Sequence, residues 1–99
     1  MAKSIYKVFM GRKLDAWYRL SPEEQQSIES KLVEALKNVG AKRLIVCNSS
    51  WSSDQWAFAG IEKFPNIEAV QKYMVVVNEL SVFRYVESTS VLGSEMELN

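Results

Sequence analysis

The stretch SPEEQQSIESKLVEALKNVG, residues 21–40, carries the clearest local signal for the fold. Ser21 is a typical N-cap residue, Pro22 suits the first helical position, and Glu24 lies where the acidic residue of a capping box belongs. Apolar residues then recur at the spacing of one helix face, and Gly40 stands where a helix end takes a positive φ angle. The stretch therefore predicts a helix over residues 22–39.

The segments on both sides of this helix have the composition of β-strands. Residues 4–10 and 42–48 are rich in β-branched and aromatic side chains, and two further strands are predicted over 55–64 and 83–92. The polar residues 49–54 form a connection that suits a hairpin. A second helix is predicted over 67–80, because Asn66 is a good N-cap and apolar residues follow it at helical spacing.

The order of these elements is strand, helix, strand, strand, helix, strand, which is that of the ferredoxin-like fold. It predicts a four-stranded antiparallel sheet with both helices on one face, an α+β arrangement. A chain of 99 residues supplies one hydrophobic core, so we expect a single domain over residues 1–99.

The sheet face away from the helices is also predicted to be apolar. We assign the small residues Ala57 and Ala59 to the helix side, which places Trp56 and Phe58 on the open face. A soluble monomer rarely exposes so large an apolar patch, so we expect a second copy of the chain or a stacked nucleic-acid strand to cover it. The residues expected to form the homodimer contact are Tyr6, Val8, Val46, Trp56, Phe58 and Tyr85.

The composition excludes several kinds of chemistry. The 12 basic residues balance the 12 acidic ones, which weakens attraction to nucleic acid without excluding it, and the chain has no histidine to act as a general base or as a metal or haem ligand. Cys47 is the single cysteine, so neither an internal disulfide nor a thiolate zinc site can form, and we expect it to be a small buried side chain. We predict no metal site and no cofactor.

The chain is expected to be cytoplasmic. Its first residues lead into a strand without the apolar core of a signal peptide, and no run of about 18 apolar residues occurs. A single cysteine fits a reducing compartment, and no membrane contact is predicted.

Residues 15–25, DAWYRLSPEEQ, resemble a segment of small darcynin-like proteins of the dimeric α/β-barrel superfamily, and the length and element order resemble that superfamily as a whole. The resemblance implies two protomers packed sheet against sheet. It also implies a small-molecule function, such as that of a cofactor-independent monooxygenase or a cyclase acting on an aromatic or polyketide-like substrate. Branches that depend on a catalytic or haem-ligating histidine are not supported, because this chain has none.

The resemblance further implies a pocket between the sheet and the helices, reached beside residues 11–20 and the end of the second helix. Asn48 and Tyr73 are candidate catalytic residues, because an amide and a phenol can hydrogen-bond a developing oxyanion. Glu87 is a third, expected on the open face beside Glu62 as a carboxylate of raised pKa. The candidate substrate-binding residues are Tyr6, Trp51, Trp56, Arg84 and Tyr85, for which a role as core or interface anchors is the alternative.

Two other functions stay open at this point. The first is a homodimeric binding or structural protein without catalysis. The second is single-stranded RNA binding, because an RNA-recognition motif has the same element order and places stacking aromatics where Ile5-Tyr6 and Trp56-Ala57-Phe58 stand. Asp54-Gln55 argue against it, since that motif has a basic residue and a glycine there.

Overall fold

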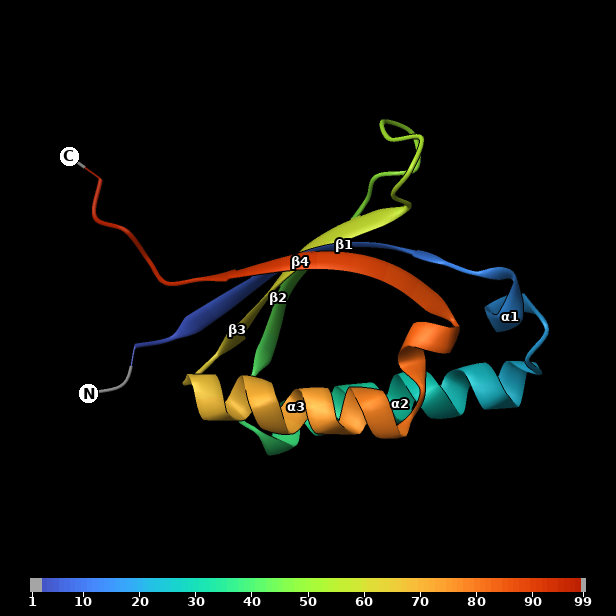
Figure 1. The fold of residues 1–99 in the computed structure, drawn as a ribbon, viewed down its shortest axis with the longest axis horizontal. Helices are drawn as coiled ribbons and strands as arrows, with labels where there is room; N and C mark the ends of the chain where they lie inside the picture. Colours follow the sequence, from blue (N-terminus) through green and yellow to red (C-terminus); the bar gives the residue numbers. More distant parts are fainter. Residues whose placement is uncertain (1–2, 99) are drawn as a thin grey trace.

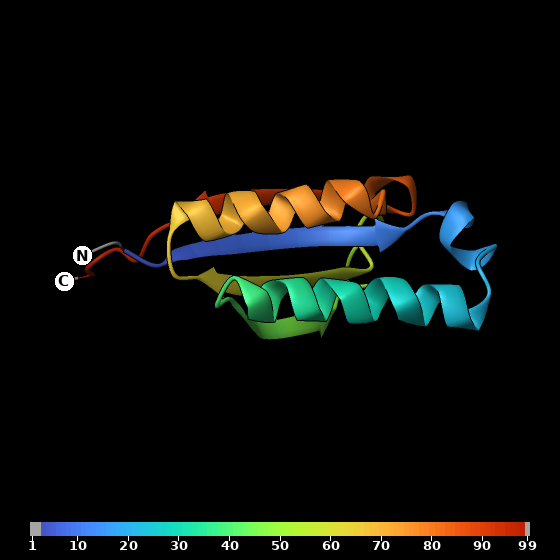
Figure 2. The ribbon, with the colours of Figure 1, turned by 90° about the horizontal axis from the view of Figure 1, so that it is seen from below.

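The computed structural model describes residues 3–98, and it has the predicted ferredoxin-like fold (Figure 1). The sheet is antiparallel with strand order β2-β3-β1-β4, so β1 and β3 are the central strands. Helices α2 and α3 lie side by side on one face of it (Figure 2). The elements are β1 (Ile5–Lys13), α1 (Asp15–Tyr18), α2 (Pro22–Asn38), β2 (Lys42–Asn48), β3 (Phe58–Phe64), α3 (Ile67–Glu79), the 3-10 helix η1 (Val82–Arg84) and β4 (Val86–Gly93).

Both long helices begin where the sequence predicts. The Ser21 hydroxyl accepts a hydrogen bond from the Glu24 amide, and the Glu24 carboxylate accepts one from the Ser21 amide, which completes the capping box. The Asn66 side chain accepts a hydrogen bond from the Ala69 amide at 2.8 Å. Gly40 has a φ of 76°, the left-handed conformation expected of a glycine after a helix. None of the helices in residues 3–98 is long and apolar enough to cross a membrane.

Strands β3 and β4 begin three residues later than the predicted boundaries. Side-chain hydrogen bonds organise residues 49–57 as a loop: the Ser49 hydroxyl donates to the Trp56 carbonyl, and the Trp56 amide donates to the Ser53 hydroxyl. Ser81 has a φ of 55° after α3, and the turn η1 then takes up the start of the predicted fourth strand. In Figure 1 the 49–57 loop rises from the sheet on the side away from the helices.

The core lies between the two helices and the end of the sheet at which β3 leads into α3. Phe64 is completely buried at the end of β3, and its ring lies 5.6 Å from the ring of Tyr73 on α3. The other buried members of this cluster are Ala35, Leu36, Ala41, Ala69, Val70 and Val77. The helical stripes predicted from the sequence supply most of these contacts.

The predicted facing of β3 is wrong. Phe58, Gly60 and Glu62 lie on the helix side with Phe64, whereas Ala59 and Ile61 lie on the open face. Two aromatic residues lie opposite glycines: Phe9 pairs with Gly60, and Phe58 pairs with Gly11. A Cβ at either glycine would lie 2.6 Å from the opposing ring, so each ring needs a glycine as its partner. Large rings, not alanines, therefore fill the space beneath the helices.

A bulge in β2 reverses the predicted facing of Val46. The register shifts between Arg43 and Ile45, so Val46 joins the helix side and Ile45 joins the open face. Of the expected homodimer contact, Val46 and Phe58 thus lie on the wrong face. Trp56 lies in the 49–57 loop. Tyr85 follows η1, and its ring packs edge-on against that of Trp17 with 6.3 Å between the ring centres. Tyr6 and Val8 lie on the open face as predicted.

Candidate functional site

A groove of about 560 Å³ opens between the helix-covered face of the sheet and the two long helices. We call it the helix-side groove. It reaches from the middle of the sheet to η1, and Lys13 and Glu29 lie at its edge, 3.4 Å apart. Its walls are largely apolar and include Phe9, Leu32, Phe58, Val77, Val82 and Val86.

Four polar side chains meet at one end of this groove, and we call them the Lys7 cluster: Lys7, Arg43, Glu62 and Tyr73. Glu62 is only 3% exposed, although it is charged. Its Oε2 accepts hydrogen bonds from Arg43 Nε at 3.1 Å and from Nη2 at 3.0 Å. The buried carboxylate is therefore compensated by a guanidinium from the neighbouring strand.

Lys7 has no such compensation. It lies opposite Glu62 in the register, yet among residues 3–98 no carboxylate oxygen is within 4.0 Å of its Nζ. Its Nζ instead lies 3.8 Å from the sulfur of Met74, a weak acceptor, and 5.7 Å from the centre of the Tyr73 ring. Burial lowers the pKa of Lys7, the Glu62 charge opposes this shift, and the Arg43 charge adds to it.

Burial raises the pKa of Tyr73 from 10.0 to about 12, and the negative charge of Glu62 acts in the same direction. The phenol thus stays protonated at neutral pH and can donate a hydrogen bond. With two cationic side chains and one carboxylate, the cluster favours a ligand that presents a carbonyl or an anionic oxygen. The rest of the groove favours the rings of that ligand.

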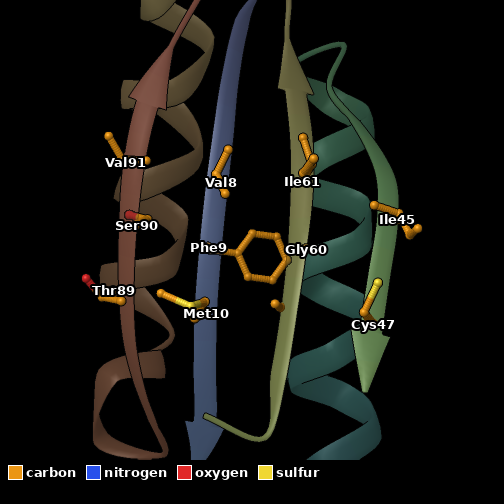
Figure 3. A pocket seen from close by; sticks show the side chains of 11 residues that line it. Val8, Phe9, Met10, Ile45, Cys47, Gly60, Ile61, Thr89, Ser90 and Val91 are labelled. Atoms are coloured by element: carbon orange, nitrogen blue, oxygen red, sulfur yellow. The ribbon is translucent and has the colours of Figure 1, made fainter. Parts of the chain in front are cut away.

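The open face carries a second, smaller groove of about 450 Å³ (Figure 3). A row of β-branched side chains crosses all four strands there, because Val8 pairs with Val91 and with Ile61, which in turn pairs with Ile45. All four point to the side away from the helices in Figure 3. Cys47 is exposed beside this row, which corrects the expectation that it is buried.

Of the three predicted catalytic residues, Tyr73 alone lines the helix-side groove. Asn48 is engaged in a turn, since its Oδ1 accepts hydrogen bonds from the Ser50 amide at 3.0 Å and from the Ser50 hydroxyl at 2.6 Å. Glu87 lies on β4, where its carboxylate accepts a hydrogen bond from Arg12 Nε at 2.6 Å. The expected approach of Glu62 and Glu87 is wrong, because β1 separates their strands and they lie on opposite faces.

The five predicted substrate-binding residues do not meet around one cavity. Tyr6 lies on the open face, 5.7 Å from Lys63 Nζ, and Trp51 is 83% exposed in the 49–57 loop. Trp56 is half-buried in the same loop, Arg84 belongs to η1, and Tyr85 packs on Trp17. None of the five lines the helix-side groove.

Sequence reasoning missed Lys7 and Arg43 as site residues. A signal for them does exist. Lys7 and Glu62 are opposite charges, and apolar residues precede and surround each of them in its strand apart from Lys63 beside Glu62. Antiparallel pairing of the first and third strands of a ferredoxin-like sheet can bring such residues opposite one another.

No protein-family model and no curated protein matches the chain, but solved structures do. A candidate chlorite dismutase matches 98% of this chain with 17% identity and a TM-score of 0.72. SnoaB, a cofactor-independent oxygenase from Streptomyces nogalater, matches 98% of this chain and 97% of its own with 12% identity and a TM-score of 0.58. A dimeric protein of unknown function and ferredoxin-like fold from Bacteroides fragilis matches 93% of this chain and 96% of its own with 12% identity and a TM-score of 0.50.

This chain shares the ferredoxin-like fold of these proteins. It spans less than half of the candidate chlorite dismutase, because the match covers 47% of that chain. It spans nearly all of SnoaB and of the protein from Bacteroides fragilis. The ferredoxin-like fold predicted from the order of the elements is thus confirmed.

Proposed function

We propose that the helix-side groove binds a small aromatic, polyketide-like molecule and that the protein oxygenates it without a cofactor. The observation that carries this proposal is the Lys7 cluster at one end of an otherwise apolar groove. Pockets for aromatic ligands are mostly apolar with a few polar groups that orient the ligand. The cofactor-independent oxygenase SnoaB has the same fold over nearly its whole length, which supports the choice of reaction.

The cluster supplies one group that such a reaction needs, a hydrogen-bond donor. The substrate loses to water a proton from the methylene carbon that is conjugated with its carbonyl group, and the Tyr73 hydroxyl donates a hydrogen bond to the oxygen on which negative charge develops. The resulting enolate passes electrons to O₂. One oxygen atom enters the product as a ketone in place of two hydrogens, and the other leaves as water.

We further propose that the open face is the contact between two copies of the chain. Val8, Ile45 and Val91 are each about half exposed or more, although they form a continuous apolar row. Charged and polar groups flank the row along the strands, with Lys63 and Tyr6 on one side of it and the Arg12–Glu87 pair on the other. An apolar centre with a polar rim is the usual anatomy of a protein interface.

The test is an oxygen-uptake assay with anthrone and dithranol as substrates, together with the absorbance of the quinone formed. We expect turnover by the unaltered protein and a loss of about tenfold or more in Tyr73→Phe, because that variant keeps the ring but cannot donate the hydrogen bond. Tyr18→Phe is the matched control, since Tyr18 is exposed and outside the groove. Binding without oxygen uptake would overturn the oxygenation and leave the groove as a binding site. Calorimetry that shows no binding of these compounds would overturn the whole proposal.

A further inference from the structure

Lys7 and Lys63 form a matched pair on the two faces of the central strands. Each Nζ lies 5.7 Å from the centre of a tyrosine ring, Tyr73 for Lys7 and Tyr6 for Lys63. Lys63 is exposed on the open face, whereas Lys7 is half-buried and lines the helix-side groove. The chain thus holds two similar lysine–tyrosine contacts that differ in their access to water.

Burial makes the uncharged amine of Lys7 easier to form than that of an exposed lysine. The titratable and charged groups that face it are Glu62 from β3, Arg43 from β2 and Tyr73 from α3, while its partner on β4 is the apolar Leu92. The Glu62 carboxylate already accepts two hydrogen bonds from Arg43. A lysine that is desolvated beside another cation is the usual setting for an amine nucleophile.

We propose that Lys7 forms an imine with the carbonyl carbon of an aromatic ketone or aldehyde bound in the helix-side groove. This rests on the proposed function in that the groove must first bind the ligand. The Lys7 nitrogen attacks the carbonyl carbon, and a carbon–nitrogen bond forms. Both hydrogens of the amine then leave with the carbonyl oxygen as water, so no oxidant or reductant is needed.

The imine narrows the substrate class to compounds with a reactive carbonyl group. An imine of an enolisable ketone loses the proton on the adjacent carbon more readily than the ketone does, and the product is an enamine. Its nucleophilic carbon can attack a second carbonyl group of the same molecule and close a ring. Lys7 thus provides the first step of a cyclisation in a chain that has no histidine, whereas the proposed oxygenation proceeds through the enolate and needs no imine.

Reductive trapping tests this inference. The full chain is incubated near neutral pH with an equimolar amount of naphthalene-2-carboxaldehyde and sodium cyanoborohydride, digested with Glu-C, and mapped by mass spectrometry. We expect Lys7 to carry the adduct, the mass of the aldehyde less one oxygen atom, at about tenfold or more the level of Lys63 or of any other lysine. In Lys63→Met the labelling of Lys7 should be unchanged, and in Lys7→Met the other lysines should keep their low level.

A ligand that cannot form an imine separates this inference from the proposed function. Calorimetry with naphthalene-2-methanol measures whether the groove binds the ring system at all. Binding of the alcohol without preferential labelling of Lys7 would overturn the imine and leave the binding groove intact. Absence of both binding and preferential labelling would overturn both proposals, and equal labelling of all lysines would overturn the imine.

Discussion

The two faces of the sheet each carry side chains that are unusual for their position. The face beneath the helices carries a lysine, an arginine and a glutamate, whereas the face without helices carries a row of valines and isoleucines. In most open sheets the covered face is apolar and the other face is polar. We infer from this difference that each face is shaped for what it contacts besides the helices, which we propose to be a ligand in the helix-side groove and a second copy of the chain on the open face.

The largest effect that separates the two faces is expected from truncating one apolar residue on each. Phe64 on the covered face is 0% exposed, and Val91 on the open face is 64% exposed. Phe64→Ala should lower the free energy of unfolding by about 3–5 kcal/mol, because it leaves a cavity in the core. Val91→Ala should lower it by less than about 1 kcal/mol in the monomer. Urea unfolding at low protein concentration measures both.

The same pair of variants also reports on the proposed interface. If a second copy covers Val91, the effect of Val91→Ala should grow as the protein concentration rises, since association stabilises the folded chain. The effect of Phe64→Ala per folded chain comes from the core and should show no such growth. Equal effects of the two substitutions at low concentration would contradict the contrast between the faces.

The next effect concerns the apolar row itself. Val8 pairs with both Val91 and Ile61, so it lies at the centre of the row. Val8→Asp should weaken the proposed dimer by about 100-fold, or roughly 3 kcal/mol, because a carboxylate would be buried in an apolar contact. Sedimentation equilibrium measures the dissociation constant.

Val75→Asp serves as the control for this substitution. Val75 is exposed to a similar extent as Val8, but it lies on α3, on the helix layer and away from the open face. The control should leave the dissociation constant unchanged. A chain that is monomeric at all concentrations, or a dimer that Val8→Asp leaves intact, would contradict the proposed interface.

The fold could be predicted from the sequence because its signals are local. The capping box at Ser21, the Asn66 cap and the helical stripes each depend on a few neighbouring residues. The facing of β3 could not be predicted in the same way. Strict alternation separates Phe58 and Gly60 from Ala59 and Ile61, but alternation alone does not say which set lies beneath the helices. That choice depends on the pairing of Phe9 with Gly60, which joins residues far apart in the sequence.

The site was only partly predictable for a related reason. Tyr73 could be recognised because a tyrosine within a helical apolar stripe faces the core. The other members of the Lys7 cluster come from three separate strands, and the bulge in β2 decides which β2 residues share their face. A bulge of this kind has no marker, such as a glycine, in residues 42–48. Chemical type alone therefore groups Tyr, Trp and Asn residues into one predicted site, although the structure does not bring them together.

A smaller effect is expected from the two arginine–glutamate pairs. Arg43 pairs with Glu62 on the covered face and Arg12 pairs with Glu87 on the open face, and both are cross-strand partners. Glu62→Gln should lower the free energy of unfolding by about 2 kcal/mol, because it leaves Arg43 and Lys7 without a buried counter-charge. The partial exposure of Arg43 to solvent keeps the effect from being larger. Glu87→Gln should change it by about 0.5 kcal/mol or less. Urea unfolding at high and low salt compares the two.

The salt dependence distinguishes burial from mere pairing. Added salt screens an exposed pair more than a buried one, so the effect of Glu87→Gln should vanish at high salt while that of Glu62→Gln persists. Equal effects of the two substitutions would mean that the carboxylate beneath the helices is no better shielded from solvent than the one on the open face.

The smallest effect is expected from Lys7→Met, and its pH dependence is the informative part. Burial lowers the pKa of Lys7 in the folded chain, while the unfolded chain keeps the ordinary value of 10.5. Between these two values the unfolded chain binds more protons than the folded one, so the stability contributed by Lys7 rises with pH in that window. Below the window the folded chain holds a poorly compensated ammonium group. Lys7→Met should therefore be more stable than the unaltered protein near neutral pH, and the advantage should shrink as the pH approaches 10.5.

Lys63→Met is the matched control on the open face for Lys7→Met on the covered face. Lys63 has the same distance to a tyrosine ring but is exposed, so its replacement should give no advantage that shrinks with pH. The measurements should stop near pH 10, because the pKa of Tyr73, raised to about 12, makes the folded chain lose stability above that point. An advantage of Lys7→Met that grows with pH, or one that Lys63→Met reproduces, would show that the groove does not favour the uncharged amine, and the imine would lose its physical basis.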